Sequence, residues 1–268
     1  MKHILIMTLA ALAATVFADA AQTNQTSQAD ARAAARAERR KNRGTYEQRA
    51  YGGIVTKPNS AKGKVVVLNA QKIVPSGDIR PAIDYIKGTI HPEMELVDVG
   101  SVKLLNPKAD ISRAGGNVGV ALVESPDLPM LVVAPESGWA VVNVAALKDG
   151  KKDGLAHRVR VELLRAFALA SGCAFMSMDP VVLYPNVLIP EDLDALKDES
   201  YGVFARTHIE RWLPVHGVTP WKVTTYDVAC KEGWAHSPTN KFEQRIWNKV
   251  HAIPKAPMKI EFDPKKGR

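Results

Sequence analysis

The pattern of apolar and polar positions predicts a mixed α/β domain in the middle of the chain. Short runs rich in β-branched residues predict strands, and Pro126-Asp127 and Glu136-Ser137-Gly138 mark turns between the later ones. A helix with Ile at every third or fourth position separates the first two strands, which favours parallel pairing, whereas the short later turns require an antiparallel strand. The predicted strands are residues 64–71, 94–100, 118–125, 129–138 and 139–147, with the helix at 78–90 and a loop or broken turn at 108–117.

The segment HRVRVELLRAFALASGC predicts a central helix over residues 157–171 that ends at Gly172. One face is wholly apolar, and the opposite face is half apolar, so we expect other elements to cover the helix on both sides. The apolar face carries Val159, Leu163, Ala166, Phe167 and Ala170, and the opposite face carries His157, Val161, Arg165 and Ala168.

The end of the chain has a different pattern. Four of the five tryptophans follow residue 200, which favours a compact helical part over a ligand platform. An extended, proline-containing loop leads into a short helix at Pro190, and residues 201–268 are predicted as a helical extension packed on the α/β domain. Its predicted helices are 201–213, 219–233 and 240–252, the last with a capping box formed by Asn240 and Glu243.

The first 20 residues have the layout of a secretory signal peptide. One Lys precedes a long apolar run, and Ala18-Asp19-Ala20 predicts cleavage before Ala21. The run is short for a bilayer span, and no later segment approaches about 20 apolar residues. These features predict an exported protein, periplasmic or extracellular, without a transmembrane span; an uncleaved N-terminal anchor is the alternative.

Residues 21–62 predict a basic, disordered arm. Nine basic and three acidic residues give this segment a charge of +6, whereas the whole chain carries +8. The arm is either a solvated tether or a contact with an anionic polymer, and outside the cytoplasm we expect no nucleic-acid partner. Residues 63–200 then form the predicted α/β domain.

Common catalytic motifs are absent from the sequence. No two of the histidines His91, His157, His208, His216, His236 and His251 stand three or four residues apart, and the chain has no phosphate-binding glycine loop. Ser137 and Ser171 lack the frame of a serine nucleophile. The sequence therefore predicts neither a metal site nor a cofactor.

The order of these elements resembles that of the metzincins, a family of zinc peptidases, and the archaemetzincins in particular. The stretches GWAVVNVAAL, RVELLRAFALASGC and FMSMDP to PEDLDAL carry the resemblance, which covers residues 64–196. It implies a zincin-like mixed sheet, with the central helix at the position of the zinc-binding helix. In the family that helix reads H-E-x-x-H-x-x-G with a third His one turn later; here only Glu162 matches. Val161, Arg165 and Ser171 replace the three ligands, and Ala168 replaces the Gly.

These replacements change the expected function. Valine cannot bind a metal, and an arginine side chain stays protonated without a lone pair to donate. We expect a metal-free pseudo-peptidase that binds a protein or peptide, with Glu162 in an ion pair within reach of Arg158 and Arg165. Two alternatives remain: a hydrolase that uses Glu162 at an atypical site, and a protein whose basic arm is its functional part.

The two cysteines, Cys173 and Cys230, are an even pair in a chain predicted to be exported. An oxidising compartment favours a disulfide between them, which would close a loop of about 57 residues and contribute on the order of 4 kcal/mol. Two separate buried thiols are the alternative, because cysteine is often buried without a partner.

Overall fold

The computed structural model describes residues 44–102, 106–148, 154–175, 182–196 and 199–252. They fall into two compact units, residues 56–224 and residues 44–55 with 225–252. The bounds of these units are not the predicted ones, because helix α8 (Val203–Trp212) belongs to the larger unit, and the predicted arm is divided, with residues 44–55 in the smaller unit and residues 56–62 in the larger one. The predicted signal peptide and residues 21–43 lie outside the described residues.

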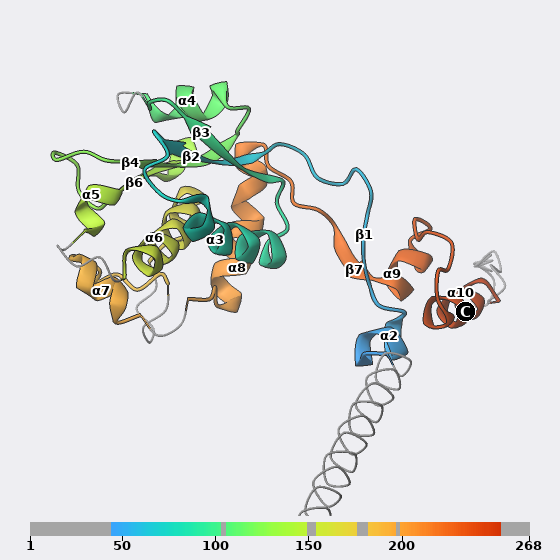
Figure 1. Ribbon diagram of the computed structural model, residues 1–268. Coiled ribbons are helices and arrows are strands. Elements are labelled where there is room, and N and C mark those ends of the chain that lie inside the picture. Colours follow the sequence, from blue (N-terminus) through green and yellow to red (C-terminus); the bar gives the residue numbers. More distant parts are fainter. Residues whose placement is uncertain (1–43, 103–105, 149–153, 176–181, 197–198, 253–268) are drawn as a thin grey trace, which may run out of the picture. The chain divides into compact units, whose positions relative to one another are not determined.

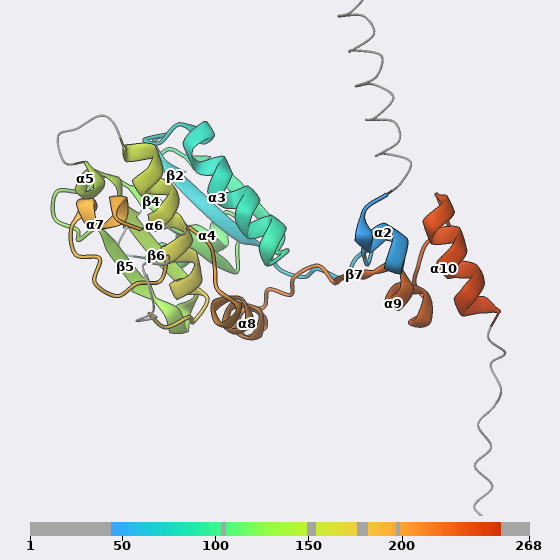
Figure 2. The same cartoon turned by 90° about the horizontal axis from the view of Figure 1, so that it is seen from below.

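The larger unit is built on a five-stranded sheet (Figures 1 and 2). The strand order is β3-β2-β4-β6-β5, and the first four strands are parallel, whereas β5 pairs antiparallel with β6 and forms one edge. The predicted mixed, mostly parallel sheet with an antiparallel edge strand is confirmed. Its strands are β2 (Val65–Ala70), β3 (Met94–Val99), β4 (Val118–Val123), β5 (Leu131–Ala134) and β6 (Trp139–Asn143).

Helices cover both faces of this sheet, as Figure 2 shows. Val65 and Val67 of β2 point into the main hydrophobic core with α3 (Ser76–Thr89) and α6 (Leu155–Ala170). Val66 and Leu68 point the other way, into a second cluster that contains Ile111 of α4 (Pro107–Arg113). Because both faces are covered, the central strands are apolar at nearly every position and not only at alternate ones. The stretch predicted at 108–117 as a loop or a broken helical turn contains helix α4 in its first half; Asn106 caps this helix, and Pro107 occupies its first turn.

Helix α6 is the predicted central helix, and almost all of it is buried. Twelve of its 16 residues are buried, including Val161 and Arg165 on the face opposite the main apolar one. The prediction of cover on both sides is thus confirmed. At its C-terminal end Gly172 has a φ of 85°, and the amide of Cys173 donates to the carbonyl of Ala168 at 3.0 Å, which is the wrapped end that glycine permits. Short elements complete this unit: a 3₁₀ turn η1 (Pro135–Ser137), α5 (Val144–Leu147), α7 (Pro190–Asp194) and a second 3₁₀ turn η2 (Leu213–His216).

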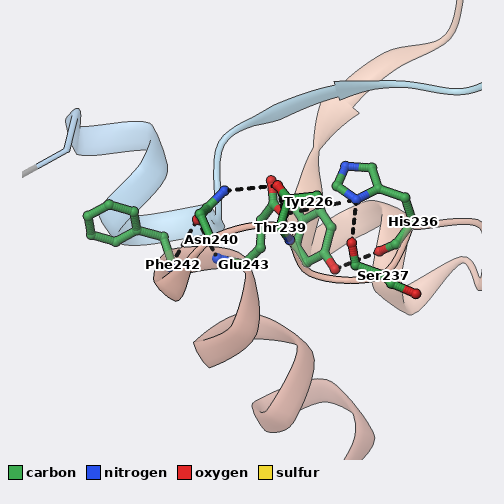
Figure 3. A network of polar contacts seen from close by, with 7 residues as sticks. All are labelled: Tyr226, His236, Ser237, Thr239, Asn240, Phe242 and Glu243. Carbon is green, nitrogen blue, oxygen red and sulfur yellow. Dashed lines mark hydrogen bonds and ion pairs between the residues drawn. The ribbon is translucent and has the colours of Figure 1, made fainter. Parts of the chain in front are cut away.

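The smaller unit consists of three short helices, α2 (Tyr46–Tyr51), α9 (Tyr226–Lys231) and α10 (Lys241–His251). Tyr226, Cys230 and Ile246 form its core. Figure 3 shows the polar contacts around it: the Tyr226 hydroxyl donates to the carbonyl of His236 at 2.8 Å, and the Glu243 carboxylate accepts from the amide and hydroxyl of Thr239 at 2.7 and 2.9 Å. Burial raises the pKa of Tyr226, so this hydroxyl remains a donor.

Two predictions for these segments were wrong. Residues 45–56 are not a disordered arm, because Thr45 and Gln48 form a capping box on α2 and Ile54–Thr56 form strand β1. The predicted helix at 219–233 is strand β7 (Val223–Thr225), which pairs with β1, followed by α9, whose cap is Thr225. Asn240 does cap α10, accepting from the amides of Phe242 and Glu243, but the predicted capping box does not form, because the Glu243 carboxylate accepts from Thr239 instead. No helix among the described residues has the length and apolar content needed to cross a membrane.

Candidate functional site

A cleft of about 380 Å³ lies between the edge strand β5 and the middle of helix α6. Glu162 and Arg165 of α6 contribute its charged groups, and the remaining lining is apolar. The apolar residues come from the strand and its approach, and from the segments after α6: Pro129, Met130, Leu131, Val133, Phe175, Val187 and Leu188.

Strand β5 has one edge without a strand partner among the described residues. Its neighbour β6 donates the Asn143 amide to the Met130 carbonyl at 2.9 Å, which makes Met130 and Asn143 a hydrogen-bonded pair. Such pairs alternate with non-bonded pairs along an antiparallel ladder. Leu131 and Val133, which face Val142 and Ala140, are therefore the residues whose N–H and C=O groups point away from β6. The side chains of the same two residues line the cleft.

Glu162 and Arg165 form an ion pair at the inner end of the cleft, as expected from their spacing on the helix. Arg165 Nε lies 2.9 Å from Glu162 Oε2, and the two side chains are 3% and 1% exposed. Burial raises the pKa of Glu162, although the charge of Arg165 acts in the opposite direction. Burial also lowers the pKa of Arg165, and Glu162 opposes this shift. Each of the two charged side chains is thus compensated by the other, which offsets part of the cost of burying it.

Arg165 also fixes the far wall of the cleft. Its Nη1 atom donates to the carbonyl oxygens of Val182 and Tyr184, both at 2.8 Å. Its guanidinium carbon lies 5.5 Å from the centre of the Phe175 ring, within the range of a cation–π contact. One side chain therefore connects α6 with both segments that follow it.

The other predicted site residues do not join the cleft lining. Val161 is completely buried in the main hydrophobic core, and Ser171 is completely buried with no hydrogen-bond partner for Oγ among the described residues. Arg158, which we expected near Glu162, binds Asp194 through Nε at 2.9 Å and Nη2 at 2.5 Å, and also donates to the Leu147 carbonyl. The long-range contact to α7 could not be predicted from helix spacing.

The two cysteines are free and buried in separate hydrophobic clusters. Cys173 donates to the Ala205 carbonyl at 3.5 Å, and burial raises its pKa to about 11. Each thiol is thus buried within its own unit, and the choice between a disulfide and two separate thiols stays a prediction.

The zinc that the family resemblance implies does not fit these side chains. Val161 offers only methyl groups, and the Arg165 guanidinium is committed to two carbonyls and to Glu162. Among the described residues, no group of three or more His, Cys, Asp or Glu side chains has an arrangement that could hold a metal ion.

The wall of the cleft that faces β5 is the part that sequence reasoning missed, whereas the wall formed by β5 lies within the strand predicted at 129–138. The opposite wall comes from Phe175, Val187 and Leu188, which lie in irregular segments without a periodic pattern.

Comparison with known proteins gives similarity at the level of structure. No family model matches the chain, and no curated protein does. A zinc-dependent peptidase from Methanocorpusculum labreanum is 14% identical, with 55% of this chain and 100% of that chain covered and a TM-score of 0.43. Archaemetzincin from Methanopyrus kandleri is 15% identical, with 59% of this chain and 98% of that chain covered and a TM-score of 0.46. Archaemetzincin from Archaeoglobus fulgidus, solved with malonate, is 14% identical, with 54% of this chain and 99% of that chain covered and a TM-score of 0.40.

The archaemetzincins, to which the sequence was likened on its motifs, are thus among the solved structures that this chain is similar to. At this identity and TM-score the similarity assigns no activity to the chain.

Proposed function

We propose that the larger unit is a metal-free, non-catalytic relative of the metzincin peptidases that binds an extended polypeptide segment along β5. The observation that carries the proposal is the cleft itself, in which an unpaired strand edge lies beside a buried ion pair. An extended chain can add to such an edge through main-chain hydrogen bonds, and alternate side chains then enter the adjoining pocket.

The side chains at the former ligand positions support binding without hydrolysis. A general base needs a reacting group or water to activate, and in the family a metal holds that water. Here Glu162 is paired with Arg165, and a buried Val161 and a carbonyl-bound Arg165 occupy the positions where two ligands would stand.

Peptide binding is tested with a pool of extended, proline-free peptides of about six residues, long enough to pair with the whole of β5. The key variant is Val133→Pro, which removes one outward N–H without breaking a ladder hydrogen bond, a change that edge strands tolerate. Val133→Ala is the matched control, because it keeps the N–H and shortens the same side chain. We expect Val133→Pro to weaken binding about tenfold relative to Val133→Ala. Equal binding by the two variants, or no binding by the wild type, contradicts the proposal.

The same peptides test for hydrolysis. We expect mass spectrometry to recover them intact after long incubation, and chelators and added zinc to leave the melting temperature of the protein unchanged. Cleavage that disappears in Glu162→Gln would instead support a hydrolase that uses Glu162 as its base.

We further propose that the protein is exported into the cell envelope or medium after removal of residues 1–20, on the strength of the signal-peptide pattern. Intact mass of the protein from the periplasm or medium should correspond to a chain that starts at Ala21. A role for the basic arm is tested by deleting residues 21–43, since a longer deletion would remove α2 and β1. Unchanged salt-sensitive binding to an anionic polymer would exclude that role.

A further inference from the structure

The Glu162 carboxylate has an acceptor that the folded chain does not use. Oε2 lies 2.9 Å from Arg165 Nε in an ion pair, but neither Oε2 nor Oε1 has a hydrogen-bond partner among the described residues, although the side chain is only 1% exposed. Leaving a buried polar atom unpaired is costly, and charged groups cost more than neutral ones. Glu162 lines the cleft, and because Oε1 is itself buried, a ligand group reaches this atom when the neighbouring side chains move aside.

We propose that Glu162 Oε1 accepts a hydrogen bond from a neutral amide N–H of the bound ligand. This inference rests on the proposed function and names the group that the cleft recognises. A ligand cation is a poorer match, because Glu162 is already neutralised by Arg165 and a second cation would lie close to the guanidinium in a poorly solvated site. A ligand anion would in turn lie beside the Glu162 carboxylate.

The apolar walls favour the same choice. Met130, Leu131, Val187 and Leu188 give a ligand apolar surface to contact but no ionic partner. A neutral amide is the polar group that loses least on leaving water for such a site, provided that it finds one acceptor.

An extended peptide bound along β5 needs a hydrogen-bond acceptor on the side of the cleft that faces away from β5. Amide groups along a strand point alternately to its two sides. A peptide paired with Leu131 and Val133 directs half of its N–H groups at β5 and the other half away from it. Those that point away need acceptors from elements other than β5, and Glu162 of α6 is a free acceptor in the same cleft.

Small probes test the inference without relying on the strand edge. Benzamide has two N–H donors, N,N-dimethylbenzamide has none, and benzamidine carries a positive charge on a similar frame. Binding is followed at about pH 8, where free carboxyl groups are ionised, through the NMR signals of the Met130 and Leu131 methyl groups. We expect benzamide to bind about fivefold to tenfold more tightly than either other probe. Equal binding of benzamide and its dimethyl analogue, or tighter binding of benzamidine, overturns the inference.

Glu162→Gln is the decisive variant because it keeps the shape of the side chain. Its amide oxygen must face Arg165 Nε, so its NH₂ group faces the cleft and offers a donor in place of the acceptor. The preference for benzamide should therefore disappear in Glu162→Gln and persist in Glu191→Gln, which changes an exposed carboxylate of α7. A preference that survives Glu162→Gln contradicts the inference. Should this variant not fold, the order in which the three probes bind to the wild-type protein decides the inference by itself.

The two proposals fail separately. Val133→Pro should weaken peptide binding and keep the benzamide preference, because it leaves Glu162 in place. If peptides bind through β5 but the probes show no preference, only the role of Glu162 is wrong. If the probes show the preference but peptides do not bind, the strand-addition proposal is wrong and the amide site remains.

Discussion

Asn143, the last residue of β6, holds the backbone of Ser125 by two hydrogen bonds. Its Oδ1 atom accepts from the Ser125 amide at 3.1 Å, and its Nδ2 atom donates to the Ser125 carbonyl at 2.8 Å. Nδ2 also donates to the carbonyl of Leu128 at 2.6 Å. This side chain thus fixes the turn that leads into β5, and with it one wall of the cleft.

Replacing Asn143 should therefore affect both stability and binding. Asn143→Ala leaves several buried backbone groups unpaired, and we expect it to lower the free energy of unfolding by about 2–4 kcal/mol in urea titration. Asn69→Ala is the control, because Asn69 makes comparable bonds to Val74 at the end of β2, away from β5. Both variants should be destabilised, but only Asn143→Ala should weaken peptide binding at a temperature where both are folded. Equal peptide binding by the two variants would contradict this role.

Stability should depend on pH through Glu162. Burial raises its pKa in the folded chain above the ordinary value of 4.5, so the folded state binds more protons than the unfolded state in the interval between the two values. The contribution of Glu162 to stability is complete below about pH 4.5 and is lost as the pH rises through the folded pKa. The difference in free energy of unfolding between the wild type and Glu162→Gln should fall as the pH rises through this interval, by at most about 1.4 kcal/mol per pH unit. A constant or rising difference would show that Arg165 outweighs burial.

The Glu162–Arg165 pair should behave as one unit. Glu162→Met leaves a buried guanidinium without its counter-ion, and Arg165→Met leaves a buried carboxylate, so each change alone should cost about 3–5 kcal/mol. The double variant should cost about 1–3 kcal/mol less than the sum, and the remaining loss reflects the Val182 and Tyr184 carbonyls. Urea titration of all four proteins measures this coupling. Additive losses would mean that the pair contributes nothing.

Two glycines should respond oppositely to alanine. Gly172 has a φ of 85°, and an added Cβ would meet the Trp212 ring at 3.1 Å, so Gly172→Ala should lower stability by about 1–3 kcal/mol. Gly77 lies in α3 with a helical backbone and open space around it, so Gly77→Ala should raise stability by about 0.4–1 kcal/mol. Thermal unfolding of both variants tests this expectation. A Gly172→Ala variant as stable as the wild type would mean that the end of α6 tolerates another backbone conformation.

The thiols of Cys173 and Cys230 should be free and unreactive in the folded protein. Burial raises both pKa values, so little thiolate is present near neutral pH. We expect two thiols per chain to react with a disulfide reagent in guanidinium and to react far more slowly in buffer, and a reductant to leave the melting temperature unchanged. Finding no reactive thiol in guanidinium without reductant would show that the disulfide forms.

The sequence predicts the sheet well because β2, β4 and β6 are buried on both faces, which makes their strands continuous apolar runs. The Glu162–Arg165 pair also follows from the sequence, since residues three apart share a helix face. The wall opposite β5 does not follow from the sequence, because Val187 and Leu188 reach the cleft only through tertiary contacts such as those of Arg165. The error at 219–233 has a similar cause: β7 is a strand because it pairs with β1, which is distant in the sequence.

The prolines at both ends of β5 carry a further consequence. An unpaired strand edge can recruit other copies of a protein into a growing sheet, which leads to aggregation. Pro129 precedes β5 and Pro135 follows it, and neither can donate a main-chain hydrogen bond. The two prolines therefore limit the length over which another strand could pair with β5, which reduces the number of main-chain hydrogen bonds that a second copy of the chain could form there.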